Sequence, residues 1–341
     1  MNRLLRCKNK LYSFPRWSMG TRFAITLLLT LSASLSFAAG RTSFPVLMEL
    51  VDTRALGLGG ALLTENEWAG GTMLNPACAA GAERSISASY ASHMIDMWSG
   101  RFTVSHLVKN RISIGGYITT FNYGTFDAAE LNIGKTGATF HAAENAFVCY
   151  AAGKYNEQIA LGGAIKYLWG TISSYNASGV AMDIGLTYDP NWHKIKLAAV
   201  LRNFGKQLTS YGKDIDPLPT EVALGSSLKL EHLPLTISGA LMFANEGEGE
   251  WDLELLPGNP GLSFGLGGEF ALPTKIDVKP MQLRIGYRSR SIDLRVGQNN
   301  DLLAGASCGV GIPYKAYTFE YTYATMGALG NIHRFGLSGT I

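Results

Sequence analysis

Hydrophobic and polar side chains alternate along most of this chain with a period of two residues. From Ala316 to Tyr323 the residues read A-Y-T-F-E-Y-T-Y, so four aromatic side chains fall on one face and polar ones on the other. A soluble sheet also alternates, but such an aromatic row is typical of a face that meets a core or a lipid interface. The alternation recurs about fourteen times along the chain and predicts a membrane barrel.

The predicted strands have the length that a tilted membrane strand needs, about 9–11 residues. They are expected at 84–93, 100–108, 112–122, 143–153, 159–168, 179–188, 195–204, 220–230, 235–244, 262–272, 281–288, 303–312, 316–324 and 332–341. The predicted fold class is therefore all-β: a transmembrane antiparallel β-barrel of about 14 strands, with an N-terminal hatch segment in the lumen.

The connections between these strands alternate in length. The short ones are 109–111, 154–158, 189–194, 231–234, 273–280 and 313–315. The others are mostly longer, at 123–142, 169–178, 205–219, 245–261 and 289–302, with shorter ones at 94–99 and 325–331. Outer-membrane barrels place short turns in the periplasm and long loops outside, so this alternation orients the barrel. Residues 292–296 are assigned to an outer loop, because an odd strand count would invert every later loop.

The two faces of each strand predict which charges lie in the lumen. Leu283, Ile285 and Tyr287, for example, alternate with polar residues and glycine. A charge on the lipid face near the midplane costs about 2–4 kcal/mol, so the charged side chains are expected inside. The predicted lumen-facing charges are Glu221, Lys229, Arg284, Arg288 and Glu320. They either hold an internal plug by ion pairs or only solvate the barrel interior.

The N-terminus carries a predicted export signal. Basic residues precede an apolar run from Phe23 to Ala38, which is shorter than a membrane span and ends in the cleavage-like triplet Ser36-Phe37-Ala38. Residues 1–38 are therefore a predicted signal peptide, with a retained anchor as the alternative. Residues 39–83 are predicted to form an N-terminal periplasmic or hatch segment, and 84–341 the barrel. Export combined with membrane strands predicts the outer membrane of a Gram-negative-type bacterium.

Composition argues against several other classes of protein. Charged residues make up 16% of the chain, and the net charge of +3 is too small to indicate nucleic acid. The histidines lie far apart without zinc spacing, and no Gly-x-Ser-x-Gly elbow occurs, so we expect no enzyme, no metal and no cofactor. Cys78, Cys149 and Cys308 are expected to be small packing residues, with a single disulfide left open.

Motifs at both ends of the mature chain resemble those of the PorV/PorQ family of outer-membrane proteins. The C-terminal part carries Leu283-Arg284-Ile285-Gly286-Tyr287-Arg288-Ser289, Glu320-Tyr321-Thr322-Tyr323 and 327–334. The N-terminal part carries a motif whose residues include Arg54, Gly57, Gly59, Gly60, Asn75, Pro76 and Ala77. The resemblance implies a fourteen-stranded barrel like the FadL-type channels, with the Asn-Pro-Ala segment inside as a hatch. It also implies a role in type IX secretion.

The hatch motif has a physical rationale of its own. Glycines allow positive φ and a close approach of the backbone to the barrel wall, and proline needs no hydrogen-bond acceptor. Asn75, which precedes a proline, is expected to be extended, with its amide bonded to backbone of the barrel or of the hatch. We expect Asn75 to be structural, with contact to a ligand as the alternative.

Two functions of different class follow. A secretion factor would bind secreted cargo proteins or secretion-system components through its long loops, helped by Tyr211, Trp251 and Leu255-Leu256. A FadL-type channel would instead pass hydrophobic small molecules such as fatty acids or aromatics, with a lateral opening where the ladder kinks, near Gly115-Gly116 or Gly162-Gly163. A purely structural barrel is a third alternative. Further expected partners are outer-membrane lipid and the barrel assembly machinery, for which His333, Phe335, Leu337 and Ile341 form the predicted C-terminal assembly signal.

Overall fold

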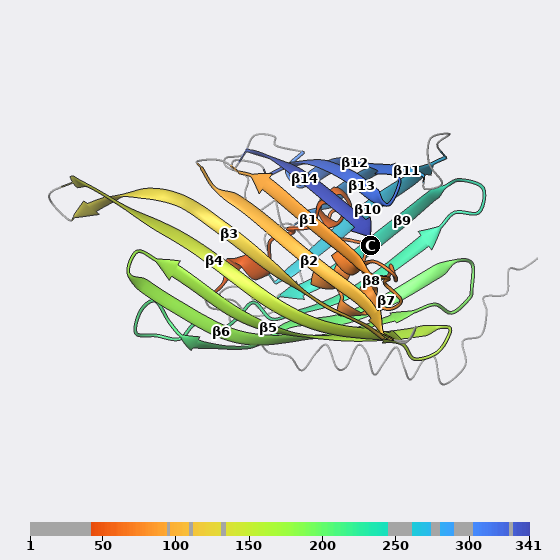
Figure 1. Cartoon of the computed structure of the whole chain (residues 1–341), viewed down its shortest axis with the longest axis horizontal. Coiled ribbons are helices and arrows are strands. Elements are labelled where there is room, and N and C mark those ends of the chain that lie inside the picture. The colour runs from red at the N-terminus through yellow and green to blue at the C-terminus, as the bar shows by residue number, and fades with distance from the viewer. Residues whose placement is uncertain are drawn as a thin grey trace, which may run out of the picture. The chain divides into compact units, whose positions relative to one another are not determined.

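Fourteen antiparallel strands form a closed barrel (Figure 1). The structure is a computed structural model and describes residues 42–93, 96–108, 112–130, 134–244, 261–273, 280–289, 303–326 and 330–341. Each strand pairs with its neighbours in the chain, and the barrel closes where β1 pairs with β14, from Ser85 opposite Thr340 to Ser92 opposite His333. The predicted signal peptide, 1–38, lies outside the described residues.

All of the predicted strands are present in the described part of the chain. Their bounds are β1 Ser85–Ser92, β2 Trp98–Val108, β3 Ile112–Glu130, β4 Gly134–Lys154, β5 Ile159–Ile172, β6 Tyr175–Tyr188, β7 Ile195–Thr209, β8 Glu221–Lys229, β9 Leu235–Ala244, β10 Leu262–Leu272, β11 Met281–Arg288, β12 Ala306–Tyr314, β13 Tyr317–Thr325 and β14 Asn331–Thr340. The predicted fold class is confirmed.

Two of the predicted long loops are wrong, because the strands continue through them. Strands β3 and β4 extend through most of 123–142, and β5 and β6 extend through most of 169–178. Cross-strand contacts such as the stacked rings of Phe126 and Phe140, 5.3 Å apart, favour pairing beyond the expected strand ends. The predicted loop at 205–219 is shortened, since β7 runs to Thr209. Of the predicted loops at 245–261 and 289–302, residues 245–260 and 290–302 lie outside the described residues, together with Trp251, Leu255 and Leu256.

The ladders do not kink at the glycine pairs where a lateral opening was predicted. Strand β3 pairs with β2 and β4 without interruption through Gly115-Gly116, and β5 pairs with β4 and β6 in the same way through Gly162-Gly163. A register shift lies instead between Met182 and Ile184, where β6 meets β7. That part of the prediction is therefore wrong: the glycines do not break the wall.

The predicted faces of the strands are confirmed. Apolar side chains on the outer face of the barrel are strongly exposed, with Ile285 at 69% and Phe319 at 53%. Their neighbours in the same strands, Arg284 and Thr322, are buried inside. Among the described residues, no helix is long and apolar enough to cross a bilayer.

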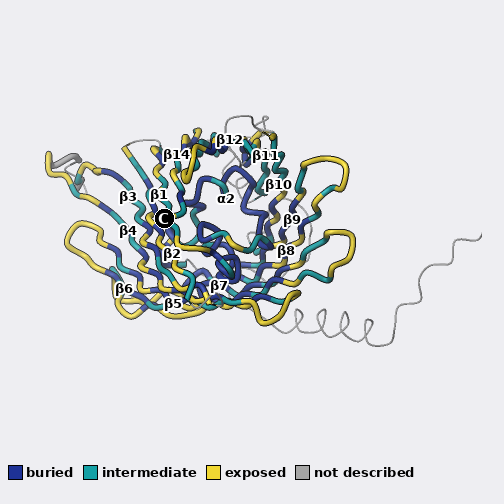
Figure 2. The backbone as a smooth tube through the Cα atoms, turned by 45° about the vertical axis from the view of Figure 1, so that its right-hand side comes forward, coloured by how far each residue is buried: buried dark blue, intermediate teal, exposed yellow. Residues whose placement is uncertain are grey.

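The N-terminal segment from residue 42 to residue 83, here called the plug, lies inside the barrel. Its short helices are η1 Pro45–Leu47, α2 Thr53–Gly57, η2 Ala69–Met73 and η3 Pro76–Ala79. Figure 2 shows α2 and the segments beside it, mostly buried, enclosed by the strands. Helix α2 contacts β11 to β14, whereas η3 contacts β4 to β6. The hatch predicted for the lumen is therefore found in its described part.

The plug runs from one end of the barrel to the other. At its start, the Ser43 amide donates to the carbonyl of Pro217 in the connection after β7, on the side of the long hairpins. At its end, the Ala82 carbonyl accepts from the hydroxyl of Ser113, near the short connection before β3. The lumen is therefore occupied along its length by the chain itself.

Candidate functional site: the plugged lumen

The Asn-Pro-Ala motif of the plug sits on a pair of glycines in the wall. Gly162 of β5 lies opposite Gly185 of β6. A Cβ atom at Gly162 would lie 2.4 Å from the backbone of Pro76 and Ala77, and one at Gly185 would lie 1.8 Å from Oδ1 of Asn75. Any larger residue at either position would displace the plug, so these glycines provide close approach rather than a kink.

A second glycine pair holds the Gly57–Gly60 turn. Gly267 of β10 lies opposite Gly286 of β11, and Cβ atoms at these positions would approach the backbone of Leu58 and Gly59 within 2.7 Å and 2.3 Å. Gly59 and Gly60 have φ values of 60° and 72°, a region that favours glycine. Gly59 thus combines a positive φ with a close approach to the wall, whereas Gly57 lies in α2 without a positive φ, and a Cβ atom on Gly60 would meet Leu50 of the plug.

Asn75 is fully buried and binds both the plug and the wall. Its side-chain nitrogen donates to the carbonyl of Leu63 in the plug, at 2.9 Å, and to that of Leu186 in β6, at 3.2 Å. Its side-chain oxygen accepts from the Ala77 amide at 3.0 Å and caps η3. Asn75 is extended, with φ −155° and ψ 116°, as the following proline requires. These contacts satisfy the side chain and support the structural interpretation.

Arg54 joins the plug to the wall by a two-pronged ion pair with Glu269. Its Nε and Nη2 donate to the two carboxylate oxygens of Glu269 in β10, at 2.9 Å and 2.6 Å. Its guanidinium also lies 4.7 Å from the ring centre of Trp68. Burial alone would lower the pKa of Arg54, but the Glu269 carboxylate raises it above its usual value. Arg54 therefore stays charged and bound.

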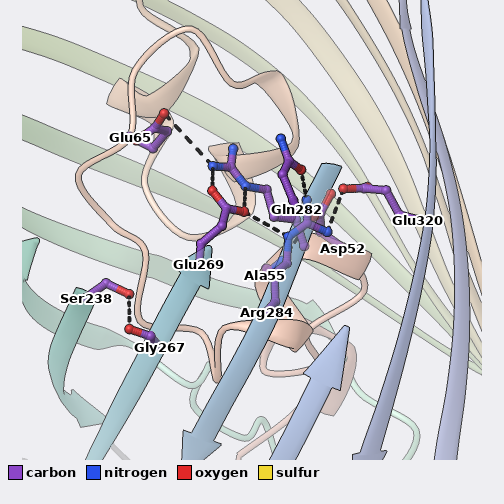
Figure 3. A network of polar contacts seen from close by, with 10 residues as sticks. Asp52, Ala55, Glu65, Ser238, Gly267, Glu269, Gln282, Arg284 and Glu320 are labelled. Atoms are coloured by element: carbon purple, nitrogen blue, oxygen red, sulfur yellow. Dashed lines mark hydrogen bonds and ion pairs between the residues drawn. The ribbon is translucent and has the colours of Figure 1, made fainter. Parts of the chain in front are cut away.

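The network continues from Glu269 along the wall. Arg284 of β11 donates to Glu269 at 2.8 Å, forms an ion pair with Glu320 of β13 at 2.9 Å, and also contacts Gln282. Thr322 of β13 adds a hydrogen bond to the Thr53 carbonyl of the plug at 2.8 Å. Figure 3 shows Glu269 between Arg284 and the plug, so removal of this one carboxylate would leave two guanidinium groups without their main partner.

Four further arginines of the wall bind backbone carbonyls of the plug. Arg101 of β2 donates to Gly70 at 2.7 Å, and Arg334 of β14 donates to Val51 at 3.1 Å. Contacts of 3.2 Å and 3.4 Å join Arg202 of β7 to Met73 and Arg288 of β11 to Met48. Because the acceptors are main-chain groups, these bonds satisfy an irregular segment that has few partners of its own.

The opposite side of the plug has a different character. Phe44 and Val46 pack in a buried cluster with inward side chains of β3 to β6, among them Tyr117, Val148 and Leu168. Many of the other wall residues in this cluster are alanines, such as Ala164 and Ala181. The sequence places no arginine in β3 to β6. Apolar surface and small side chains therefore supply most of the packing on this side. Two polar contacts add to it: the Val46 amide donates to the buried Glu144 carboxylate of β4 at 3.1 Å, and Lys154 of β4 pairs with Glu67 of the plug at 2.7 Å.

A buried polar cluster interrupts this apolar side at the register shift of β6. Lys166 of β5 lies 2.7 Å from the carboxylate of Asp183 and donates to the side-chain oxygen of Asn203 at 2.6 Å. The backbone amide of Asn203 donates to the Asp183 carboxylate at 2.8 Å. Asn203 has a φ of 57° at the bulge. These contacts bind three strands together and satisfy charges that would otherwise be costly to bury.

The predicted lumen charges fall into two groups. Glu221 pairs with Arg202, Arg284 pairs with Glu269 and Glu320, and Arg288 reaches the plug, so all of these lie inside as expected. Lys229 is exposed at the end of β8 and does not take part in the plug contacts described above. Sequence reasoning missed Glu269, Arg101, Arg202 and Arg334. These residues occupy inward-facing positions in the alternation of their strands, and that position is the signal from which they could have been predicted to lie in the lumen.

The predicted C-terminal assembly residues lie on the outer face. Phe335, Leu337 and Ile341 are 57%, 40% and 64% exposed, and the His333 ring makes a tilted contact with Tyr321 and an edge contact with Tyr323. Their role in assembly stays a prediction. Cys78, Cys149 and Cys308 are free, with Cys78 buried in the plug and the other two on the outer face. The described residues contain no cluster of ligands that could hold a metal ion.

A small polar cavity of about 190 Å³ separates the plug from the wall near the short connections. Its lining includes Asp52, Arg54 and Trp68 from the plug, and Glu320 and Ser338 from the wall. The arrangement as a whole is a fourteen-stranded barrel whose lumen holds an N-terminal plug, with a buried ionic network on one side and mostly apolar packing on the other. Such an architecture agrees with the FadL-type barrel that the family resemblance implies.

Comparisons with known proteins identify the fold. No protein-family model and no curated protein sequence matches the chain. Among solved structures, the Pseudomonas putida toluene transporter TodX is 10% identical, with a TM-score of 0.55 over 89% of this chain and 98% of that chain. The KdgM porin is also 10% identical, and the match covers 75% of this chain and 99% of that chain. Its TM-score of 0.35 is too low to support an inference. The likeness to TodX shows a shared fold.

Proposed function

We propose that this protein is an outer-membrane barrel of the FadL type, through which small hydrophobic molecules enter the cell. The observation that carries the proposal is the fold shared with a toluene transporter over nearly the whole of both chains. The predicted export signal and the apolar outer face of the barrel support the outer-membrane location. The proposal involves no catalytic step.

The apolar side of the plug is the proposed entry site. Phe44 is 1% exposed, and its ring lies against Gly179 and near Leu168, where a Cβ atom on Gly179 would contact both. The Phe44 backbone has a φ of 58°, which is unfavourable for a side chain of this size. A hydrophobic molecule that takes the place of this ring would meet apolar wall atoms and relieve that strain.

The ionic side is proposed to keep the plug in place during this exchange. Arg54, Arg101 and Arg334 bind it independently of Phe44. The hydrophobic molecule would therefore move along the apolar side while the plug stays attached to the other strands.

Whole-cell uptake of radiolabelled toluene and radiolabelled tetradecanoate tests the proposal. Cells that carry the barrel should accumulate at least one of them faster than cells without it. Phe44→Ala should increase the rate, because it removes the ring that occupies the apolar site. Leu50→Ala is the matched control, since Leu50 is equally buried in the plug but belongs to the other core cluster. Equal uptake with and without the barrel would contradict the channel.

The type IX secretion role stays a prediction from the resemblance. The motif residues that carry the resemblance hold the plug against the wall, and either function can use such a plug. A mild-detergent pull-down of the mature protein distinguishes the two functions. Secreted proteins that share a C-terminal domain would favour secretion, whereas a barrel that carries fatty or aromatic compounds would favour the channel.

A further inference from the structure

A groove with a volume of about 820 Å³ lies on the outer face of β1 to β4, near the short connections. Its lining includes Ile86, Val104, Ile114 and Cys149, and Val104 and Ile114 are 43% and 45% exposed. The groove is therefore open to the surroundings of the barrel.

The register of the strands explains the hollow. On the outer face, Gly116 lies between Val104 of β2 and Cys149 of β4, so this row has no side chain at its centre. Two residues further along the strands, a bulky row follows, made of Phe102, Ile118 and Phe147. These three side chains are 49%, 39% and 49% exposed and form a ridge beside the hollow. The wall is thus recessed by about one side chain where the strands approach the short turns.

The end of the groove carries a positive charge. Arg84, which precedes β1, and His106 of β2 both line it, and both are exposed. Ile341, the last residue of the sequence, lines the same end, and its backbone amide donates to the Arg84 carbonyl at 2.9 Å. The other lining side chains are uncharged, so the groove combines a hydrophobic slot with the Arg84 guanidinium at the end that faces the short connections. A phospholipid has the complementary arrangement, with an acyl chain attached to a phosphate-bearing head group.

We propose that this groove binds one phospholipid, with an acyl chain over Val104 and Cys149 and the phosphate at Arg84. The inference rests on the outer-membrane location and on the orientation in which the short turns face the periplasm. It does not depend on which molecule the barrel transports. Periplasm-facing lipids would then be held at one side of the barrel instead of exchanging freely around it.

Native mass spectrometry of the full barrel, released from membranes in a mild detergent, tests the proposal. The wild-type protein should retain a mass addition equal to one phospholipid. Cys149→Phe should lose this addition because the ring fills the groove. Cys308→Phe is the matched control: Cys308 is also a free, exposed cysteine on the outer face, but it does not line the groove. It should retain the lipid.

A second variant tests the head-group contact. Arg84→Gln should release the lipid at a lower collision energy than the wild type, while Cys308→Phe should not. Heat-modifiable migration on gels shows for each variant whether the barrel has folded. Absence of a phospholipid from the folded wild type, retention of lipopolysaccharide in its place, or equal loss in both cysteine variants would each overturn the proposal. Failure of hydrophobic uptake alone would leave the lipid addition unchanged and would count only against the channel.

Discussion

The two sides of the plug are held by different chemistry. Toward β10 to β14 the contacts are charged, with Arg54, Glu269, Arg284 and Glu320 in one network. Toward β3 to β6 the packing is mostly apolar and depends on small wall residues, such as Gly162 and Ala164. Polar contacts are also present there, among them the Val46 amide to Glu144 and the exposed pair of Glu67 and Lys154. Charged hydrogen bonds demand particular partners at particular distances, whereas apolar contact tolerates exchange of one hydrophobic group for another. The difference indicates that the charged contacts hold the plug in place, whereas a hydrophobic molecule can replace the apolar contacts on the other side.

The ionic side is expected to respond most strongly to mutation. Glu269→Ala would leave Arg54 and Arg284 without their shared carboxylate, and loss of one partner in a buried ion pair costs about 3–5 kcal/mol. Urea unfolding of the purified barrel in detergent would measure this loss. Glu157→Ala, in an exposed turn, is the control and should leave stability unchanged. A similar small loss in both variants would mean that the network does not anchor the plug.

The close contact between Gly162 and the plug backbone should give the next largest effect. Gly162→Ala places a methyl group 2.4 Å from the plug backbone, and overpacking of this kind costs about 1–3 kcal/mol. Its neighbour Gly163 provides a matched control, because a Cβ atom there meets only the Asp183 carbonyl, at 3.8 Å. Protease sensitivity of the plug should rise in Gly162→Ala alone. Equal protease sensitivity of the two variants would contradict the close contact between Gly162 and the plug.

Asn75→Ala tests whether the hydrogen bonds of the motif are structural. The change leaves the carbonyls of Leu63 and Leu186 without this donor, at a cost of about 1–3 kcal/mol. Uptake of hydrophobic probes should persist, since the apolar site around Phe44 does not include this side chain. Unchanged stability combined with lost uptake would instead assign Asn75 to ligand binding.

Lys229→Ala should have the smallest effect. Lys229 was predicted among the lumen charges, but it is exposed at the end of β8, and surface substitutions usually change stability by less than about 0.5 kcal/mol. The same urea titration measures the change in stability. Glu221→Ala serves as the comparison, because Glu221 lies on the same face of β8 but is buried against Arg202. A large loss in Lys229→Ala would show that the rim of the barrel also takes part in holding the plug.

The alternation of single residues determined the strands, their number and their faces. The period of two is a local property of an extended chain, so Ile285 and Arg284 could be assigned to opposite faces without knowledge of their partners. The same reasoning placed Glu221, Arg284, Arg288 and Glu320 inside. It was less successful at strand ends, because a polar alternation such as that of 123–142 is compatible with either a loop or a strand until cross-strand contacts decide.

Only the tertiary structure decided which inward residues meet the plug. Glu269 pairs with Arg54 across more than two hundred residues of chain, and Gly162 and Gly185 become one seat only when β5 and β6 are in register. Such contacts depend on the closure of the barrel and on the path of the plug, neither of which is encoded in any short window of sequence. The alternation therefore determined the wall, whereas the packing of the lumen, and with it the candidate site, followed from the three-dimensional arrangement.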